Sequence, residues 1–196
     1  MTSGYWNESA ETMSRDELTS HQLHKLAETL DHAYNRNAFY KNKMDAAGVA
    51  PSDIKSLDDV SKLPFVDKTD FRDQYPLGML CVDRSQLREM HMSSGSTGSP
   101  VVMAYTQKDL DQWGECVARC YYMAGLVSGD SIQITPSFGL FNGGFGFYHG
   151  ARISNMFVVP TGSGNTSRQV KMMKDFNIKG LMGVVSYGIR IMEVMH

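Results

Sequence analysis

Seven of the eight residues from Ser93 to Pro100 are serine, threonine or glycine, which makes this stretch the best candidate for binding an anion. Glycine lets the backbone approach phosphate oxygens closely, successive N–H groups can converge on them, and hydroxyl groups add further donors. The spacing matches neither G-x-x-x-x-G-K-[ST] nor G-x-G-x-x-G, the two standard phosphate-binding patterns. From its composition alone, the stretch is either a phosphate-binding loop of a third kind or an ordinary turn between two strands.

The runs on either side of this stretch, Leu87 to Met92 and Val101 to Tyr105, have strand character. Further along, helical and strand patterns alternate. The sequence predicts helices within 106–125, 145–153, 166–176 and 186–196, and strands at 132–135, 156–159 and 180–185. Such alternation is typical of right-handed crossover units on a parallel sheet. The last strands are almost entirely apolar, as expected when helices cover both faces of the sheet.

The residues before Leu87 are predicted to be mainly helical. Ser14 to Glu17 has the form of a capping box, and leucines follow it at spacings close to helical. A second short helix that carries Phe39 and Met44 should end at Gly48. We therefore predict a helical segment over residues 1–86 and an α/β segment over 87–196 that contains the loop 93–100. Together these segments make one incomplete α/β domain, in which amino-terminal helices precede a βαβαβ layer.

The length of 196 residues is that of about one domain. With 42% hydrophobic residues, the composition is typical of a folded chain. Its 19 lysines and arginines against 21 acidic residues give a formal charge of -2, so the basic excess that favours nucleic-acid binding is missing. The amino terminus lacks the pattern of a secretion signal, and no apolar run approaches the roughly 18 residues of a membrane span. We expect a cytoplasmic protein without a nucleic-acid or membrane partner.

The three cysteines are odd in number and lack a second ligand pair, which favours reduced thiols over a disulfide framework or a metal site. Cys116 and Cys120 lie four positions apart on one face of a predicted helix. We expect both side chains to be buried as small apolar residues.

The run from Met92 to Pro100 resembles the phosphate-binding signature of the adenylate-forming superfamily, [ST]-S-G-[ST]-T-G-x-P, and its flanks resemble the phenylacetate-CoA ligase branch. Other segments resemble landmarks of this branch in the same order, namely Tyr5-Trp6-Asn7, Leu63-Pro64-Phe65, residues 68–73, Tyr75-Pro76, Tyr105-Thr106, residues 139–144 and Ser186-Tyr187. The resemblance covers essentially the whole chain.

This resemblance implies the amino-terminal part of the adenylate-forming ligase fold and a two-step reaction that uses ATP, Mg²⁺ and coenzyme A. An aryl carboxylate attacks the α-phosphate of ATP to give an acyl-adenylate, and the thiol of coenzyme A then displaces AMP. The phosphate-binding residues that it implies are Ser93, Ser94, Gly95, Ser96, Thr97 and Gly98. Phe138, Phe141 and Gly143 resemble the wall of the aryl-acid pocket, where flat rings suit a phenyl group, although these phenylalanines could equally be core.

Three departures from the family pattern stand out. Ser99 replaces the lysine that usually precedes the signature proline, which removes a cation beside the phosphates. The family's His-Tyr pair is transposed to Tyr148-His149, and Arg152 occupies an acidic position. The later motifs that hold ribose, magnesium and the adenylating carboxylate lie in a carboxy-terminal portion that is missing here. No catalytic residue is therefore assigned, and we expect this chain to need that portion as a partner.

Two alternatives stay open, a truncated nucleotide- or acyl-binding module without complete catalysis and a deazaflavin-cofactor adenylating enzyme of the same branch. The strand and helix alternation is still running at His196. We therefore expect an apolar edge strand to be exposed, and with it a tendency to form homo-oligomers.

Overall fold

The computed structural model describes residues 4–95 and 99–195. Its contacts group into two compact units, which are described separately below. The helical unit comprises Ser9–Ala104, and the α/β unit comprises Tyr105–His196 together with the amino-terminal residues up to Glu8. This grouping follows contacts, whereas the division of the sequence at residues 86 and 87 follows the type of element and stays a proposal.

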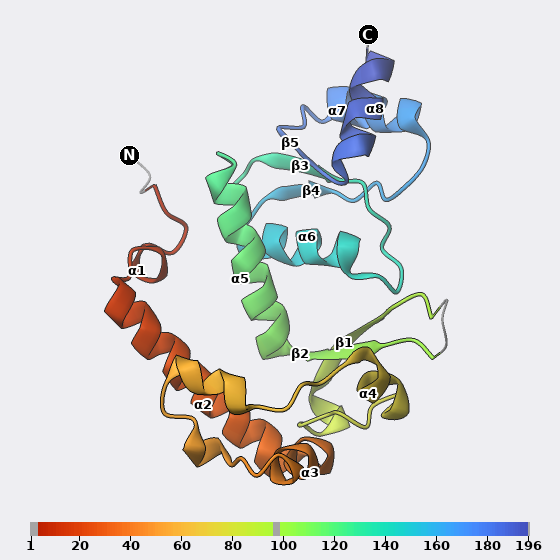
Figure 1. The fold of residues 1–196 in the computed structure, drawn as a ribbon. Helices are drawn as coiled ribbons and strands as arrows, with labels where there is room; N and C mark the ends of the chain where they lie inside the picture. Colours follow the sequence, from red (N-terminus) through yellow and green to blue (C-terminus); the bar gives the residue numbers. More distant parts are fainter. Residues whose placement is uncertain (1–3, 96–98, 196) are drawn as a thin grey trace. The chain divides into compact units, whose positions relative to one another are not determined.

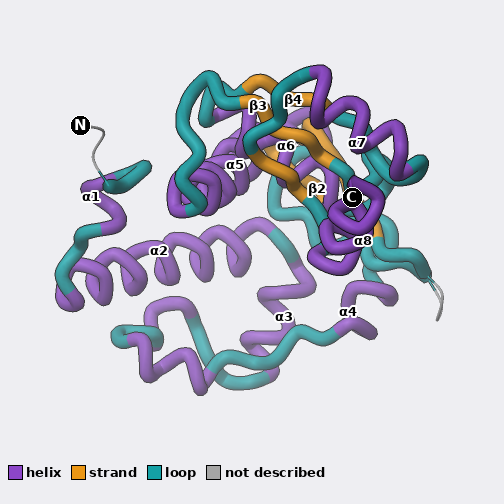
Figure 2. Tube along the Cα trace, turned by 90° about the horizontal axis from the view of Figure 1, so that it is seen from above, coloured by secondary structure: helices purple, strands orange, loops and turns teal. Residues whose placement is uncertain are grey.

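The helical unit is organised along one long helix (Figure 2). Its elements are α2 (Arg15–Arg36), α3 (Ala38–Ala46), α4 (Lys68–Asp73), the 3-10 helices η1 (Pro51–Asp53), η2 (Leu57–Lys62) and η3 (Arg84–Gln86), and strand β1 (Leu87–Met92), with the short α1 (Glu8–Glu11) before them. The predicted capping box starts α2, because the Ser14 N–H donates to the Glu17 carboxylate at 2.8 Å and the Glu17 N–H donates to Ser14 Oγ at 3.3 Å. The expected helices are therefore confirmed.

Asn37 joins α2 to α3 and fixes the corner between them. Its side-chain oxygen accepts from the Phe39 N–H at 2.8 Å and so caps α3. Its amide nitrogen donates to the carbonyls of Gly78 and Leu80, at 2.9 and 2.8 Å. One side chain thus ties the start of α3 to the segment that leads toward β1.

Strand β1 pairs with β2 (Val102–Thr106) in a two-stranded sheet, and the candidate loop connects them. The bounds of β1 are those expected from the sequence, and those of β2 differ by one residue at each end. A connection this short joins antiparallel neighbours, since parallel strands need a crossover of a dozen or more residues. Strands β1 and β2 therefore form a hairpin.

The α/β unit has a parallel sheet of order β4-β3-β5, formed by β3 (Ser131–Ile134), β4 (Phe157–Val159) and β5 (Gly180–Met182). Its helices are α5 (Gln107–Met123), α6 (Asn142–Ile153), α7 (Thr166–Asp175) and α8 (Val185–Met195). Figure 1 shows α6 on one face of the sheet and α7 with α8 on the other. The expected βαβαβ layer of an α/β fold is confirmed.

The core of this unit lies under the central strand. Ile132 and Ile134 of β3 are fully buried, together with Tyr121 and Ala151 from α5 and α6. Helices α5 and α6 approach closely because α6 carries glycine at the contact. A Cβ at Gly150 would lie 2.6 Å from Val117 Cβ, which is too close for any side chain.

The expectation that Cys116 and Cys120 are buried is wrong, since both are exposed. The buried face of α5 is formed by Leu110, Gly114, Ala118 and Tyr121. This face is centred on small residues that allow α6 to come close, and it points both cysteines outward. The spacing of four positions does put both cysteines on one face of the helix, but that face is the exposed one.

Among the residues that the structure describes, none of the helices combines the length and the apolar character that a membrane crossing requires.

Candidate functional site

The neck of the candidate loop is closed by Ser93 and Val101. The Ser93 N–H donates to the Val101 carbonyl at 2.9 Å, and the Val101 N–H donates to Ser93 Oγ at 2.9 Å. The hydroxyl of Ser93, predicted to bind phosphate, thus accepts a hydrogen bond that holds the loop ends together. It keeps its own proton as a donor for a further partner.

The predicted phosphate-binding residues divide into two groups. Ser94 is exposed and Gly95 is half-buried, just past the loop neck. Gly95 has φ of 65°, a left-handed conformation that side chains with a Cβ adopt at a cost. Ser96, Thr97 and Gly98 lie outside the described residues. The backbone conformation of the loop therefore explains why the motif has glycine at position 95.

A polar pair with one buried member lies on β1 just before the loop. His91 is 2% exposed, and its Nε2 is 2.6 Å from Glu89 Oε1 on the same face of the strand. The sequence analysis missed this pair. The signal was present, because Leu87, Glu89 and His91 alternate along one face, which is how a half-buried strand places its inward side chains.

The carboxyl ends of β3 and β5 form a second candidate region, in the α/β unit. In open α/β sheets, ligands bind outside the carboxyl ends of the strands where the strand order reverses. Strand β3 connects onward to β4 on one side and has β5 on the other, so the reversal lies between β3 and β5. Thr135 follows β3 and Gly183 follows β5, so these two residues lie on either side of the reversal.

Thr135 binds the two strand ends together. Its N–H donates to the Met182 carbonyl at 3.0 Å, and its hydroxyl donates to the same oxygen at 2.9 Å. A Cβ on Gly183 would overlap the Thr135 hydroxyl. The region therefore depends on glycine at this position, where the two backbones come close.

The predicted acid-pocket residues all lie in or after the segment that follows β3, but they point in different directions. The Phe138 ring lies 5.4 Å from the Phe145 ring, edge to face, and packs against the buried core. Phe141 is 53% exposed and lies just before the first residue of α6. Gly143 is exposed in the first turn of α6. The structure therefore brings only Phe138 into an aromatic cluster.

The transposed pair takes part in the same aromatic cluster. His149 lies with its ring 5.6 Å from Trp113 of α5 and 6.4 Å from Phe145. Tyr148, its neighbour, lies 6.4 Å from Phe138. Arg152, at the position that is acidic in the family, is exposed. Thus His149 serves the packing between α5 and α6.

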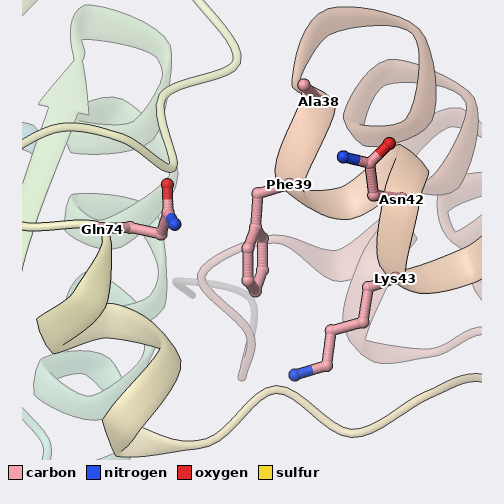
Figure 3. A pocket seen from close by; sticks show the side chains of 5 residues that line it. All are labelled: Ala38, Phe39, Asn42, Lys43 and Gln74. Carbon is pink, nitrogen blue, oxygen red and sulfur yellow. The ribbon is translucent and has the colours of Figure 1, made fainter.

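Two hollows contain none of the residues predicted to bind phosphate or the acid. One of about 340 Å³ in the α/β unit is lined by Gln107, Leu110, Asp111, Tyr148, His149, Arg152 and Ile153. The other, of about 510 Å³, is in the helical unit and is lined by Ala38, Phe39, Asn42, Lys43 and Gln74 (Figure 3).

The charge in the larger hollow is already compensated. The Lys43 ammonium is paired with the Asp70 carboxylate, and this hydrogen bond lowers the pKa of Asp70 below its ordinary value. The hollow therefore offers no free cation to an anionic ligand, and it contains none of the predicted site residues.

In the described ranges 4–95 and 99–195, no group of three histidine, cysteine, aspartate or glutamate side chains is placed to hold a metal ion.

Comparison with protein-family models gives no match. Among curated proteins, the chain is 41% identical over 188 residues to phenylacetate-coenzyme A ligase of Aromatoleum evansii, which covers 96% of this chain and 43% of that protein. It is 40% identical over 183 residues to the phenylacetate-coenzyme A ligase of Escherichia coli strain K12, covering 93% of this chain and 42% of that protein. The chain thus spans less than half the length of these curated relatives.

Solved structures agree with the sequence comparison. A 2-hydroxyisobutyryl-CoA ligase in complex with 2-HIB-AMP and CoA superposes with a TM-score of 0.92 and 30% identity, over 98% of this chain and 42% of that one. The same enzyme in its postadenylation state gives a TM-score of 0.91. The fold is therefore that of the adenylate-forming coenzyme A ligases, over their amino-terminal portion.

Proposed function

We propose that this chain, which corresponds to an amino-terminal portion of the phenylacetate-coenzyme A ligases, supplies the phosphate-binding loop and part of the acid pocket of an adenylate-forming ligase. One observation carries the proposal. The signature stretch from Ser93 to Pro100 connects the paired strands β1 and β2, within a fold that a coenzyme A ligase with bound adenylate matches over 98% of this chain.

The proposed reaction has two steps. An oxygen of an aryl carboxylate attacks the α-phosphorus of ATP, an O–P bond forms, and pyrophosphate leaves. The sulfur of coenzyme A then attacks the acyl carbon, the bond to AMP breaks, and the thiol proton is released. The enzyme's task is to hold the triphosphate against charge repulsion and to keep water from the mixed anhydride.

The loop is suited to the first of these tasks. In our proposal the backbone N–H groups and hydroxyls of the loop point at the β- and γ-phosphates, with Ser94, Gly95, Ser96, Thr97 and Gly98 as the binding residues. The left-handed conformation of Gly95 and the closed neck at Ser93 support this role. Mg²⁺ accompanies ATP as its counterion, and we assign it no ligand in this chain.

The acid pocket is proposed for the segment after β3. Phe138 contributes a ring that packs edge to face on Phe145 and so presents a rigid aromatic wall. Phe141 and Gly143 are exposed, and we propose that they face the acid once the rest of the ligase is in place. An aryl acid is favoured because the curated relatives are named for phenylacetate.

Pyrophosphate exchange into ATP tests the proposal. The 196-residue chain is assayed alone and together with the carboxy-terminal portion of the A. evansii relative, with phenylacetate, benzoate and 2-hydroxyisobutyrate as acids. We expect exchange only when both portions and an aryl acid are present. Exchange with 2-hydroxyisobutyrate alone would move the substrate class to aliphatic hydroxy acids, and no exchange with any acid would contradict the proposed activity.

A binding module without catalysis is the second candidate, and it would use the same loop, residues 93–100, to bind the nucleotide. The two functions differ in one measurement. A binding module binds Mg-ATP in titration calorimetry, yet shows no pyrophosphate exchange when the carboxy-terminal portion is added. For either function, we also propose a cytoplasmic location and association with further copies of the chain.

A further inference from the structure

Two thiols lie next to each other on the exposed side of α5. Cys116 and Cys120 are both exposed, and they are four positions apart in this helix. Residues at this spacing are neighbours on a helix surface, with about 5–6 Å between their Cβ atoms. The helix therefore presents a pair of sulfur atoms that one ligand can reach together.

The spacing of this pair suits a bridge through one metal ion better than a disulfide. A disulfide holds its Cβ atoms about 3.5–4.5 Å apart, so closing one between two turns of α5 would distort the helix. An ion that lies between two sulfur atoms, with metal–sulfur bonds of about 2.3 Å, separates them by up to about 4.6 Å. Two cysteine side chains that turn toward each other reach this separation while the helix keeps its geometry.

The number of ligands decides which kind of ion the pair can hold. Structural zinc sites use four protein ligands. Over residues 4–95 and 99–195, no group of three histidine, cysteine, aspartate or glutamate side chains is placed to hold a metal ion. Soft thiolate ligands select Cu(I), which accepts two of them in a near-linear arrangement. The missing second ligand pair, which disfavours a zinc site, is no obstacle to such an ion.

A cation with an unused donor lies beside the thiols. Arg119 follows Cys116 by three positions, so the two are neighbours on the helix surface, and its Nη2 lies 3.2 Å from Glu115 Oε1. The Nε of Arg119 is buried, and among the residues that the structure describes it has no hydrogen-bond partner. A buried N–H without a partner is costly, and a negatively charged acceptor on the adjacent turn would satisfy it. Two thiolates on one Cu(I) carry a net negative charge and would be such an acceptor.

We propose that Cys116 and Cys120 form a binding site for a soft, thiophilic cation such as Cu(I), and that Arg119 offsets the charge of the two thiolates. Each thiol gives up its proton as its sulfur bonds to the ion, so two protons leave for each Cu(I) and no electron is transferred. The inference goes beyond the proposed ligase function and does not rest on it.

Competition with a chromogenic Cu(I) chelator tests the site. The 196-residue chain is titrated without oxygen against the Cu(I)–chelator complex, and the loss of colour measures the copper that the protein withdraws. We expect one Cu(I) per chain, with close to two protons released per ion at pH 6. Zn(II) should be held at least about hundredfold more weakly, since the pair supplies only part of the ligand set that zinc takes.

Substitutions of single cysteines identify the ligands. Cys116→Ser and Cys120→Ser should each lower the affinity for Cu(I) by at least about hundredfold, because one of the two sulfur bonds is lost. Cys81→Ser removes the half-buried third cysteine and should bind like the native chain. Circular dichroism checks that each variant keeps its helices.

A second control lies on the same helix. Met123 is 76% exposed, but it follows Cys116 by seven positions and so lies about 10.5 Å further along the helix axis. Its thioether is therefore too far away to share an ion with both cysteines, and Met123→Leu should leave the affinity unchanged.

The role of Arg119 has its own test. Arg119→Gln should weaken Cu(I) binding by about tenfold, as is typical of substitutions next to metal ligands. Arg119→Lys keeps the positive charge and should recover part of the affinity. Equal binding by the native chain and Arg119→Gln would remove Arg119 from the site.

Several results would overturn the inference. They are a loss of affinity in Cys81→Ser as large as that in Cys116→Ser, one Cu(I) bound per two chains, and equal affinities for Zn(II) and Cu(I). A chain that lacks either Cys116 or Cys120 and still binds as tightly as the native chain would show that the two thiols do not act as a pair. None of these measurements involves nucleotide or acid, so their outcome is independent of the ligase assay.

Discussion

The indole Nε1 of Trp6 donates a 2.7 Å hydrogen bond to Oε2 of Glu115, a residue 109 positions later in the sequence. Asn7 donates to the other carboxylate oxygen at 3.0 Å, and Arg119 forms an ion pair with it at 3.2 Å. Burial would raise the pKa of Glu115, but these hydrogen bonds outweigh it and hold the pKa below its ordinary value. One carboxylate on α5 thus holds the amino-terminal segment in place.

Removal of this carboxylate should destabilise the protein measurably. Glu115→Ala leaves the Trp6 and Asn7 donors without their partner, and we expect a loss of about 1–2 kcal/mol in the free energy of unfolding. Urea denaturation measures it. Glu28→Ala, which removes an exposed carboxylate from a surface ion pair, is the control and should change stability by less than about 0.5 kcal/mol. Equal effects in the two variants would contradict the role of Glu115.

The contribution of Glu115 should depend on pH. Because its pKa is lowered in the folded state, the charged form is favoured by folding, and the stabilisation is fully present above the pKa of the unfolded chain, about 4.3. It is lost as the pH falls through the folded pKa. The stability difference between the native chain and Glu115→Gln should therefore be constant from about pH 6 to 8 and shrink below about pH 4. A difference that grew toward acid pH would show the opposite sign.

The glycine contact between α5 and α6 should resist even a methyl group. Gly150→Ala places a Cβ within 2.6 Å of Val117 Cβ, so we expect a loss of about 1–3 kcal/mol from overpacking. Gly188→Ala, in α8, has open space around the new Cβ and should be neutral or stabilising by up to about 1 kcal/mol. Thermal unfolding compares them. Partial recovery in Gly150→Ala with Val117→Ala would identify the clash as the cause.

The loop hydroxyls should decide nucleotide affinity. Replacing both Ser96 and Thr97 by alanine removes two hydroxyl donors, and we expect Mg-ATP to bind at least about tenfold more weakly in titration calorimetry. Ser61→Ala, at an exposed hydroxyl in η2, is the control and should leave the affinity unchanged. Equal affinities for the native chain and the double variant would remove the loop from the nucleotide site.

Position 99 offers the converse experiment. The family usually has lysine where this chain has the exposed Ser99, so Ser99→Lys adds a cation beside the proposed phosphates. We expect Mg-ATP affinity to rise by about three- to tenfold, and the gain to fall as salt is added, because screening weakens exposed charge interactions. A gain that is insensitive to salt would point to a cause other than charge.

Local features of this fold could be predicted from the sequence. The helix starts at Ser14 and Thr106 follow from capping boxes, in which residues three positions apart satisfy the first backbone N–H groups of the helix. Strand β1 and the alternation of helices and strands after it follow from patterns that extend over a few residues. Such signals need no knowledge of distant contacts.

The features that depend on distant contacts could not be predicted. The Trp6–Glu115 bond joins residues far apart in sequence, and the exposure of Cys116 was missed because the buried face of α5 is set by its contact with α6. At the site, the motif identified the loop, whereas only the structure separates Phe138, which packs inward, from the exposed Phe141. Packing decides in which direction each side chain of a connecting segment points, and the amino-acid composition does not reveal this packing.

The hydrogen bonds that join the two ends of the loop bear on whether its sequence can be exchanged. Ser93 and Val101 are joined by two hydrogen bonds, which fix the alignment of the two strands at the ends of the loop. We therefore expect loop sequences of the same length to be accepted between these two positions. Protein engineers could use this arrangement to vary anion preference while leaving the scaffold unchanged.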